Sequence, residues 1–289
     1  MLLKIELKRL GTFSPLRYPG GKAAFTGILD QIIKLKQLHG SVYVEPYAGG
    51  AGAALSLLFL EKVDRIVIND LDPAIFAFWK AATEESEWFA SQVATIPLSV
   101  NEWRRQRQIY LNGSEHSTRE LGFALFYLNR TNRSGIVEGW PIGGLDQCGK
   151  WKIDARFNRE ALSARIRAIG LYRNRIEVMN SDGIALAKEY LIKNEGLVYL
   201  DPPYFAKGKS LYLNHYKSED HKSLAKLLNR HRNSAWVLTY DNVEPIRKLY
   251  PKRRILDFSL NYSVHSAKTG SEILIPSDSL GPLFAESSR

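Results

Sequence analysis

The residues best suited to chemistry form the run Val198-Tyr-Leu-Asp201-Pro202-Pro203-Tyr204-Phe205. Its apolar part predicts a buried strand that ends at Leu200, so the following residues leave the carboxyl edge of the sheet, where open α/β sheets bind ligands. Two consecutive prolines fix the backbone and remove two N–H donors, which leaves carbonyl groups available as acceptors. An acidic side chain, rigid acceptors and an aromatic ring together suit the exocyclic amine of a base. The plain alternative is a strand followed by an ordinary proline turn.

The chemistry that this run could perform is the orientation of an amine for methylation. The carboxylate of Asp201 and the carbonyl of Pro202 can each accept one hydrogen of the amine, so that the nitrogen lone pair faces an incoming methyl group. Tyr204 can stack on a base that has been turned out of its duplex. We therefore predict Asp201, Pro202, Pro203 and Tyr204 as catalytic residues.

A glycine-rich turn is the second feature with chemical potential. The run Val42-Tyr-Val-Glu45-Pro46-Tyr47-Ala48-Gly49-Gly50-Ala51-Gly52 predicts a strand, a tight turn and the start of a helix. Small residues in such a turn let the backbone approach a nucleoside closely, and an acid about 20 residues later can bond both ribose hydroxyls. The run Asn69-Asp70-Leu71-Asp72 supplies that acid after the next predicted strand. The turn alone would serve NAD equally well, so a nicotinamide-dependent oxidoreductase is one alternative.

Strands that alternate with helices are expected to position these residues. Short β-branched runs, each followed by a turn and a helical pattern, predict a doubly wound α/β sheet with mostly parallel strands. Two C-terminal runs lack an intervening helix, so we expect them to form an antiparallel pair at the sheet edge. The predicted strands cover residues 42–45, 65–69, 175–179, 197–200, 235–239, 254–262 and 272–276.

The segment 101–172 interrupts this rhythm and is interpreted as an insertion. It is rich in arginine, contains a glycine-rich part from Gly135 to Gly149, and holds three of the six tryptophans. From Trp103 to Arg175 there are 14 Lys+Arg against 6 Asp+Glu, in a chain with a net charge of +10. Such a cluster can bind a polyanion by releasing its counterions. A basic, solvated surface without a partner would have the same composition.

The composition excludes several other classes of protein. The single Cys148 rules out an internal disulfide framework and a cysteine-rich zinc site, and no histidine pair has metal-ligand spacing, so we expect no metal. No apolar run approaches the roughly 20 residues that span a bilayer. Charges recur throughout the first ten residues, unlike in a signal peptide. We therefore expect a soluble, cytoplasmic protein.

In the order of its motifs, the chain resembles the Dam-type (alpha-group) adenine-N6 site-specific DNA methyltransferases over most of its length. The resemblance implies a Rossmann-like fold that binds S-adenosylmethionine (SAM). The motif Ser14-Pro-Leu-Arg17-Tyr18-Pro19-Gly20-Gly21-Lys22 resembles the family's N-terminal motif, which implies that Tyr18 and Lys22 flank the methionine part of the cofactor. The run Glu177-Val-Met-Asn180-Ser181-Asp182-Gly183 matches a family motif, which implies that Asp182 contacts the cofactor's adenine amine. The implied cofactor-binding residues are Tyr18, Lys22, Glu45, Pro46, Tyr47, Gly49, Gly52, Asp70, Leu71 and Asp182.

Some of these positions have a structural alternative. Asp70 is implied as the ribose ligand and Leu71 as the residue that packs on the cofactor's adenine, whereas Asp72 is better explained as a helix cap. Asp182 could cap the following helix and bind the cofactor at the same time. The glycine-rich turn departs from the usual family form, in which Pro-Phe and a single glycine are commoner; Tyr47 and Gly50 stand in those places.

The insertion also resembles its counterpart in the family. The run Phe126-Tyr-Leu-Asn129-Arg130-Thr131-Asn132-Arg133-Ser134-Gly135 is similar to the junction that leads into the target-recognition region. Arginine reads guanine and asparagine reads adenine in the major groove, while other arginines contact only phosphates. The implied DNA-binding residues are Asn129, Arg130, Asn132, Arg133 and Trp140. A common family form has an aromatic residue at position 132 or 133. We therefore expect this chain to recognise a DNA sequence that differs from the family's best-known one.

The resemblance implies an enzyme that transfers a methyl group from SAM to a flipped-out adenine in duplex DNA. Its catalytic domain would cover residues 1–100 and 173–289, and its target-recognition domain residues 101–172. Methylation of cytosine N4 or of RNA adenine remains an alternative, whereas NAD chemistry would leave Asp201 and the basic insertion unexplained. The family's distribution suggests a bacterial or phage protein, with or without a cognate restriction endonuclease. We expect a monomer, because one subunit can flip one base, with a dimer on a palindromic site as the alternative. Tyr262, in Asn261-Tyr262-Ser263, is either a core residue or part of the base pocket.

Overall fold

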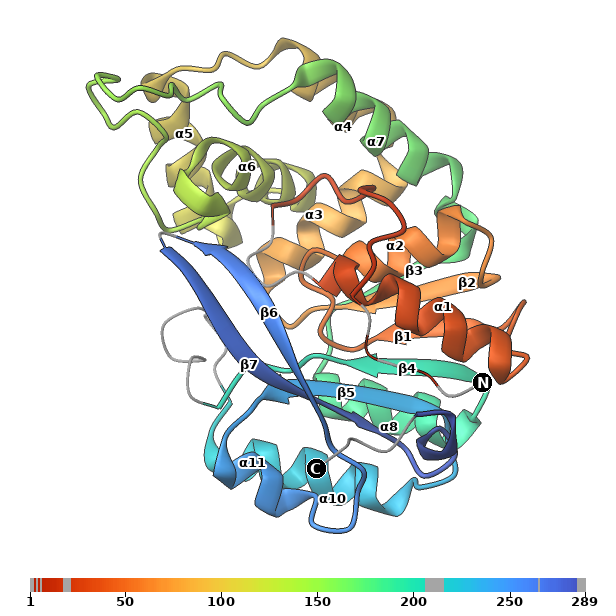
Figure 1. Ribbon diagram of the computed structural model, residues 1–289. Helices are drawn as coiled ribbons and strands as arrows, with labels where there is room; N and C mark the ends of the chain where they lie inside the picture. Colours follow the sequence, from red (N-terminus) through yellow and green to blue (C-terminus); the bar gives the residue numbers. More distant parts are fainter. Residues whose placement is uncertain are drawn as a thin grey trace. The chain divides into compact units, whose positions relative to one another are not determined.

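The computed structural model describes residues 3, 5, 7–17, 22–205, 216–264 and 266–284 (Figure 1). By its contacts, the chain divides into two compact units. We call the first the sheet unit (Met1–Thr12, Lys22–Leu71 and Met179–Arg289) and the second the helical unit (Phe13–Gly21 and Asp72–Val178). No helix within the described ranges is long and apolar enough to cross a membrane.

A seven-stranded sheet has the order β3-β2-β1-β4-β5-β7-β6. Strand β1 pairs in parallel with β2 and β4, and β4 pairs in parallel with β5, whereas β7 runs antiparallel to both β5 and β6. The predicted sheet, mostly parallel with an antiparallel C-terminal edge, is therefore confirmed. The strands are β1 Val42–Glu45, β2 Arg65–Asn69, β3 Ile176–Met179, β4 Gly196–Leu200, β5 Trp236–Asp241, β6 Leu256–Val264 and β7 Ser266–Pro276.

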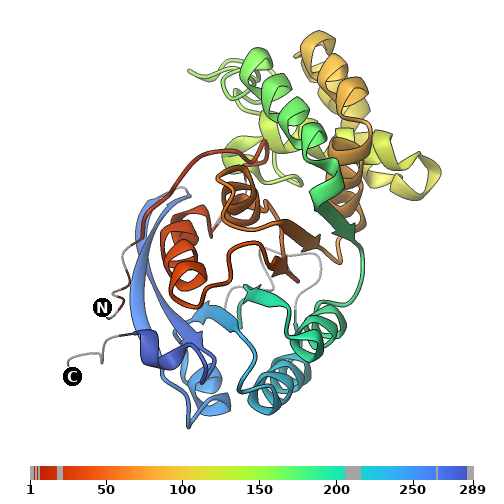
Figure 2. The same cartoon turned by 90° about the vertical axis from the view of Figure 1, so that its right-hand side faces the viewer.

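Helices cover both faces of the strands in the sheet unit. Figure 2 shows α1 and α2 on one side and α8 and α10 on the other. Helix α10 buries His221, Leu224, Ala225 and Leu228, whose spacing places them on one helical face against the sheet. Among its described residues, this unit has the helices η1 Lys22–Phe25, α1 Thr26–Leu35, α2 Gly52–Phe59, α8 Gly183–Lys193, α10 Ser218–Arg230, α11 Glu244–Leu249 and η5 Gly281–Leu283.

The alternation of side chains along the strands separates an apolar face from a partly polar one. In β5, Trp236, Leu238 and Tyr240 join the core that contains residues of α8, α10 and α11. Because successive side chains point to opposite faces, Thr239 lies on the other face, and Tyr199 of β4 does so too. The ring of Tyr199 lies 6.2 Å from that of Phe25, which comes from η1. This second face carries the polar groups of the candidate site.

The helical unit is built around aromatic rings. Its core contains Phe78, Phe89, Phe123 and Phe126, whose ring centroids are 5.2–6.1 Å apart in five contacting pairs. Because Phe78 and Phe89 come from α3 and α4, these helices share the core of α6, and the unit begins well before residue 101. The helices are α3 Pro73–Glu84, α4 Ser86–Thr95, α5 Val100–Leu111, η2 Gly113–Glu115, α6 Thr118–Thr131, η3 Arg133–Gly135, α7 Arg159–Leu171 and η4 Arg173–Arg175.

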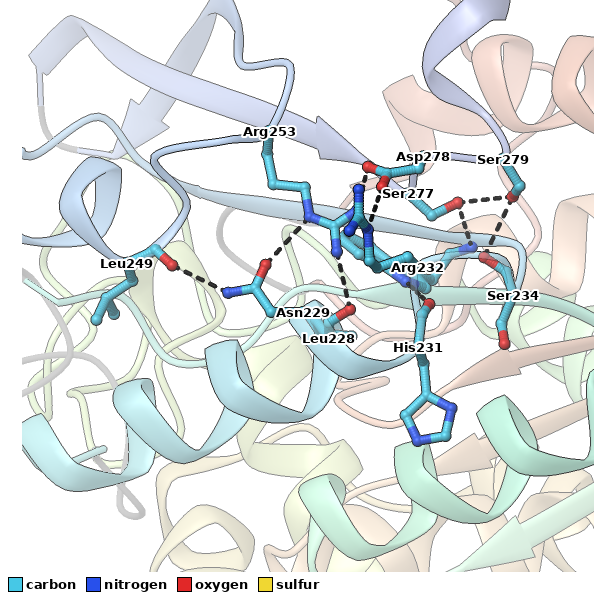
Figure 3. A network of polar contacts seen from close by, with 11 residues as sticks. Leu228, Asn229, His231, Arg232, Ser234, Leu249, Arg253, Ser277, Asp278 and Ser279 are labelled. Carbon is cyan, nitrogen blue, oxygen red and sulfur yellow. Dashed lines mark hydrogen bonds and ion pairs between the residues drawn. The ribbon is translucent and has the colours of Figure 1, made fainter.

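A polar network around Arg253 ties the end of α10 to the sheet (Figure 3). The Arg253 guanidinium pairs with the carboxylate of Asp278, and it donates to the carbonyl of Leu228 at 3.2 Å and to Asn229 Oδ1 at 3.1 Å. It also lies 5.2 Å from the ring centre of Trp236. The last carbonyls of a helix need partners from outside the helix, and Arg253 supplies one for α10.

Candidate active site

The turn after β1 is anchored by the buried carboxyl group of Glu45. Glu45 Oε1 accepts hydrogen bonds from the hydroxyl of Tyr43 at 2.9 Å and from the backbone N–H of Ala54, in α2, at 3.0 Å. Burial raises the pKa of Glu45 to about 8, although these two hydrogen bonds act in the opposite direction. Glu45 is therefore largely neutral near pH 7, and it fastens the start of α2 to the end of β1.

The glycine-rich turn approaches the end of β2 closely. Gly49 has a φ of +46°, in the left-handed region that favours glycine, and Ala51 has a φ of +44°. The backbone N–H of Gly49 donates to Asp70 Oδ2 at 2.9 Å. A Cβ on Gly52 would lie 3.2 Å from the Cβ of Ala23, so this position also favours glycine. The predicted nucleoside turn and its predicted ribose acid are thus in direct contact.

A residue that the sequence did not single out connects three loops of this edge. Asn69 is 1% exposed, and its Nδ2 donates to the carbonyls of Pro46 at 2.8 Å and Ser181 at 3.0 Å. Its Oδ1 accepts from the backbone N–H of Ser181 at 2.8 Å. A strand-terminal asparagine is a signal for such a role, but its partners cannot be read from the sequence.

The loop after β3 packs against the glycine-rich turn through Tyr47. A Cβ on Gly183 would lie only 2.3 Å from the Tyr47 ring, so the ring occupies the space that any other residue would fill. The hydroxyls of Tyr47 and Tyr216 are hydrogen-bonded at 2.5 Å. Asp182 caps α8, because its Oδ1 accepts from the N–H of Ala185 at 2.8 Å. A carboxylate at this cap lies beside the turn that the motif order assigns to the cofactor.

The other residues near the predicted cofactor site differ in exposure and in role, and some lie outside the described residues. Leu71 is 47% exposed at the end of β2, so its apolar side chain is available to a ligand. Asp72 caps α3, accepting from the N–H groups of Ala74 and Ile75, as its alternative explanation predicted. Tyr18 and the side chain of Lys22 lie outside the described residues, and so do the side chains of Asn261, Tyr262 and Ser263.

The segment Asp201–Phe205 follows β4 and is held by side chains of β5 and β7. The Thr239 hydroxyl donates to Asp201 Oδ1 at 2.8 Å, and the Tyr204 hydroxyl donates to Glu272 Oε1 at 2.7 Å. The backbone N–H of Phe205 donates to Asp241 Oδ1 at 3.0 Å. Asp241 and Glu272 are direct partners in the β5–β7 ladder, so adjacent strands supply the supports.

Burial distinguishes the residues of this segment. Pro202 and Tyr204 are buried, Asp201 and Pro203 are partly exposed, and Phe205 is 38% exposed. The Phe205 ring lies 5.1 Å from the ring of His221, on α10. Phe205 is thus the accessible aromatic ring of the run, although sequence reasoning gave the aromatic role to Tyr204.

In the helical unit, the side-chain amides of the two predicted DNA-binding asparagines form hydrogen bonds with backbone groups of the protein. Asn129 is 2% exposed, accepts from the N–H of Arg17 at 2.7 Å and donates to the carbonyl of Gly135 at 2.9 Å. Asn132 is fully buried, and its Oδ1 accepts from Trp103 Nε1 at 2.6 Å. Its Nδ2 donates to the carbonyls of three further loop residues, Ile136, Val137 and Gly139. Both amides therefore shape the loop after α6.

Arg130 lies in a cluster of positive charge. Its Nε is buried without a hydrogen-bond partner among the described residues. Burial, and to a smaller extent three neighbouring guanidinium groups, lowers the pKa of Arg130 to about 10; these neighbours are Arg17, Arg165 and Arg156. The pKa of Arg17 is lowered by burial and by Arg156. Like charges held together in this way provide a strong site for an anion.

The other predicted DNA-binding residues are accessible. Arg133 is exposed, and Trp140 is 58% exposed. The ring of Trp140 stacks on that of Trp103 at 6.1 Å, and the Arg107 guanidinium lies 5.5 Å and 5.2 Å from the two ring centres. An exposed aromatic ring supported by a buried one, beside a cation, suits contact with a nucleic acid.

The sheet order and the motifs at its strand ends define a methyltransferase with a Rossmann-like fold. The chain belongs to the family of D12 class N6 adenine-specific DNA methyltransferases, whose model matches residues 18–264. The family resemblance of the sequence motifs is therefore confirmed.

Three individual proteins match this chain at low sequence identity. The Type II methyltransferase M.MjaIII of Methanocaldococcus jannaschii is 21% identical over 256 residues, which are 81% of this chain and 86% of that protein. A structure described as a candidate RNA methyltransferase, PH1948 from Pyrococcus horikoshii, matches with a TM-score of 0.41 and 9% identity, covering 93% of this chain and 92% of that one. The rRNA methyltransferase aviRa from Streptomyces viridochromogenes gives a TM-score of 0.35 and 11% identity, covering 88% and 86%.

Proposed function

We propose that this chain transfers a methyl group from SAM to the N6 atom of an adenine flipped out of duplex DNA. One observation carries the proposal. Strand β1 pairs in parallel with β2 and β4, so Asp70, the glycine-rich turn and Asp201 leave the same edge of the sheet on adjacent strands. A cofactor bound to the first two groups would have its reactive end near the third.

The residues present fit SAM, which supplies a methyl group activated by its sulfonium. The left-handed turn at Gly49 lets a nucleoside reach the backbone. We propose that Asp70 bonds the ribose hydroxyls, that Leu71 covers one face of the adenine, and that Asp182 accepts from its amine. We propose that the rest of the cofactor-binding site is formed by Tyr18, Lys22, Glu45, Pro46, Tyr47 and Gly52.

In the proposed reaction, Asp201 and Pro202 hold the nucleophile. The carboxylate of Asp201 and the carbonyl of Pro202 each accept one N6 hydrogen, which directs the nitrogen lone pair at the methyl group. As the N–C bond formed, the bond between that methyl group and the sulfonium would break and leave a neutral thioether, and the carboxylate of Asp201 would stabilise the positive charge that develops on N6. The same carboxylate would receive the proton that N6 then loses. Positioning in line supplies much of the remaining rate enhancement.

Two aromatic residues are proposed to contact the target base. The hydroxyl of Tyr204 donates to Glu272 and the residue is only 6% exposed, so we propose that Tyr204 contacts the base through its ring alone. Phe205 is the more exposed ring, and we propose that it forms a second wall of the base pocket. Stacking of this kind offsets part of the few kcal/mol that base flipping costs.

The helical unit is proposed to bind the duplex, with residues 101–172 as the target-recognition region. The cluster around Arg130 would neutralise backbone phosphates, which gives affinity without sequence information. Arg133 and Trp140 are the accessible candidates for contacts in a groove. Asn129 and Asn132 would act indirectly, because their amides are committed to the loop backbone. We propose a monomer as the active form, since one subunit can flip one base.

A methyl-transfer assay tests the proposed activity. Purified protein is incubated with SAM carrying a tritiated methyl group and with unmethylated duplex DNA, duplex RNA or no acceptor. We expect label in DNA with the wild type and a loss of at least 100-fold with Asp201→Ala, because the variant lacks the acceptor for the amine. Label only in RNA, or equal label with Asp201→Ala, would refute the proposal.

A further inference from the structure

We propose that Thr239 is a positioning residue that fixes the carboxylate of Asp201 for catalysis, with Tyr199 holding Thr239 in the donating orientation. The inference rests on the proposed function for the role of Asp201, but the hydrogen-bond chain itself comes from the structure. All three residues belong to the sheet unit. No sequence motif includes Thr239, and Tyr199, although it lies in the run before Asp201, had no role assigned to it.

The parallel register of β4 and β5 brings Thr239 to Asp201. Leu200 is paired with Leu238, so the next residue of each strand, Asp201 and Thr239, lie beside one another where β4 ends. Thr239 is fully buried, and its Oγ1 lies 2.8 Å from Asp201 Oδ1. A β-branched residue in a strand has restricted χ1 freedom, so its hydroxyl is held at a defined point.

The donors and acceptors of this chain can be assigned from chemistry. An ionised carboxylate only accepts hydrogen bonds, and a threonine hydroxyl has one hydrogen to donate. Thr239 therefore donates to Asp201, and the Tyr199 hydroxyl, 3.0 Å from Thr239 Oγ1, must donate to Thr239. Burial, and to a smaller extent Asp201, raises the pKa of Tyr199 well above its ordinary value. Tyr199 consequently keeps its proton and remains a donor.

Tyr199 also reduces the chance that Thr239 turns away. The carbonyl of Leu200 lies 3.5 Å from Thr239 Oγ1 and could compete for its hydrogen. When Tyr199 donates to one lone pair of the threonine oxygen, the hydroxyl hydrogen is directed elsewhere, and the shorter contact is the one to Asp201. With one carboxylate oxygen held, the position of the other is set before the base arrives, which is the kind of preorganisation that an amine acceptor needs.

The test compares Thr239→Val with Thr239→Ser, because valine keeps the shape and removes the hydroxyl, whereas serine keeps the donor. Thr83→Val is the matched control, since Thr83 is also buried (3% exposed) and its Oγ1 has no hydrogen-bond partner among the described residues. With DNA and SAM, Thr239→Val should lower kcat about 10- to 100-fold, the effect of losing a hydrogen bond to a charged group. Both KM values should change less than about threefold. Thr239→Ser should recover most of the loss, and Thr83→Val should match the wild type.

A crystal structure of each variant supplies a readout that does not depend on activity. In Thr239→Val the Asp201 carboxylate should change rotamer or occupy two, while Thr239→Ser and Thr83→Val keep the wild-type rotamer. Tyr199→Phe should keep the fold and lower kcat about two- to fivefold, less than valine at 239 because the threonine donor remains. An unchanged Asp201 rotamer together with an unchanged kcat in Thr239→Val would overturn the inference. If the wild type methylates no DNA, the proposed function fails, and the rotamer comparison still decides whether Thr239 positions Asp201.

Discussion

The side-chain amide of Asn69 pairs with the backbone of Ser181 in both directions. Asn69 Oδ1 accepts from the N–H of Ser181 at 2.8 Å, and Asn69 Nδ2 donates to its carbonyl at 3.0 Å. The same Nδ2 donates to the carbonyl of Pro46 at 2.8 Å. One buried side chain therefore sets the spacing of the loops after β1 and β3, which carry much of the proposed cofactor site.

Replacing this amide should loosen the cofactor site. In Asn69→Ala, the carbonyl of Pro46, which is buried, and that of Ser181, which is partly buried, lose their partner; this should cost about 1–3 kcal/mol of unfolding free energy. We expect the Kd for SAM to rise about tenfold, measured by isothermal titration calorimetry. Asn112→Ala, at an exposed helix end, is the control and should leave both quantities unchanged. If Asn69→Ala bound SAM with the wild-type Kd, the loops would keep their spacing without the Asn69 amide.

Two neighbouring acids should respond differently to the same change. Asp70→Ala removes the proposed ribose acceptor and the partner of the Gly49 N–H, so the Kd for SAM should rise about 10- to 100-fold. Asp72→Asn replaces one good N-cap with another, so its Kd should stay within about threefold of wild type. Calorimetry on both variants checks the assignment. A larger effect at Asp72 than at Asp70 would mean that the ribose acid has been misassigned.

The buried Glu45 makes stability depend on pH. Its folded pKa of about 8 lies above the ordinary value of 4.5, so the folded protein holds this proton more tightly than the unfolded chain does. The stability it contributes is fully present below about pH 4.5 and is lost as the pH rises through about 8. Glu45→Gln keeps an acceptor for Tyr43 and Ala54 but cannot ionise.

Denaturant titrations at about pH 5, 7 and 9 measure this dependence. As the pH rises, the wild type should lose stability relative to Glu45→Gln, by about 1.4 kcal/mol for each unit of pKa difference between the folded and unfolded states. Thr83→Val serves as a non-titrating control. A difference between wild type and Glu45→Gln that is the same at all three pH values would contradict the assignment.

The cluster around Arg130 predicts opposite effects on DNA affinity and stability. Arg130→Met removes a charge that three neighbouring arginines repel, so the free energy of unfolding should stay equal or rise. Its affinity for DNA should fall, and the slope of log K against log salt should decrease in magnitude by about 1. Lys193→Gln, an exposed residue paired with Glu189 on α8, is the control. An unchanged salt slope in Arg130→Met, measured by fluorescence anisotropy, would remove Arg130 from the DNA interface.

The sequence predicted the parallel strands closely because their residues have a local cause. The predicted ranges 42–45 and 65–69 match β1 and β2, since β-branched runs bounded by turn residues have few other conformations. Strand β7 was predicted from residue 272 but begins at Ser266. Its first part is the polar run Ser266-Ala-Lys-Thr-Gly-Ser271. This run has no apolar pattern that would predict a strand, and it is extended because its backbone pairs with β6.

Candidate site residues could be predicted from the sequence only where their place in the chain, directly after a strand, also brings them to the site. Asp201 and Asp70 stand directly after strands, so sheet topology alone brings them to one edge. Asn132 was predicted to contact DNA from its residue type, but its amide bonds to nearby carbonyls, a pairing decided by the path of the loop. The contact of Thr239 with Asp201 could not be predicted for the complementary reason, because it depends on a register between strands that are far apart in the sequence.

Identification of the methylated nucleoside tests the central claim most directly. Unmethylated duplex DNA is treated with the protein and SAM, digested to nucleosides, and examined by mass spectrometry, with Asp201→Ala alongside. The account predicts N6-methyladenine with the wild type and none above background with Asp201→Ala. N4-methylcytosine in place of N6-methyladenine would contradict the assignment of the target base, and the absence of any methylated nucleoside would contradict the proposed activity itself.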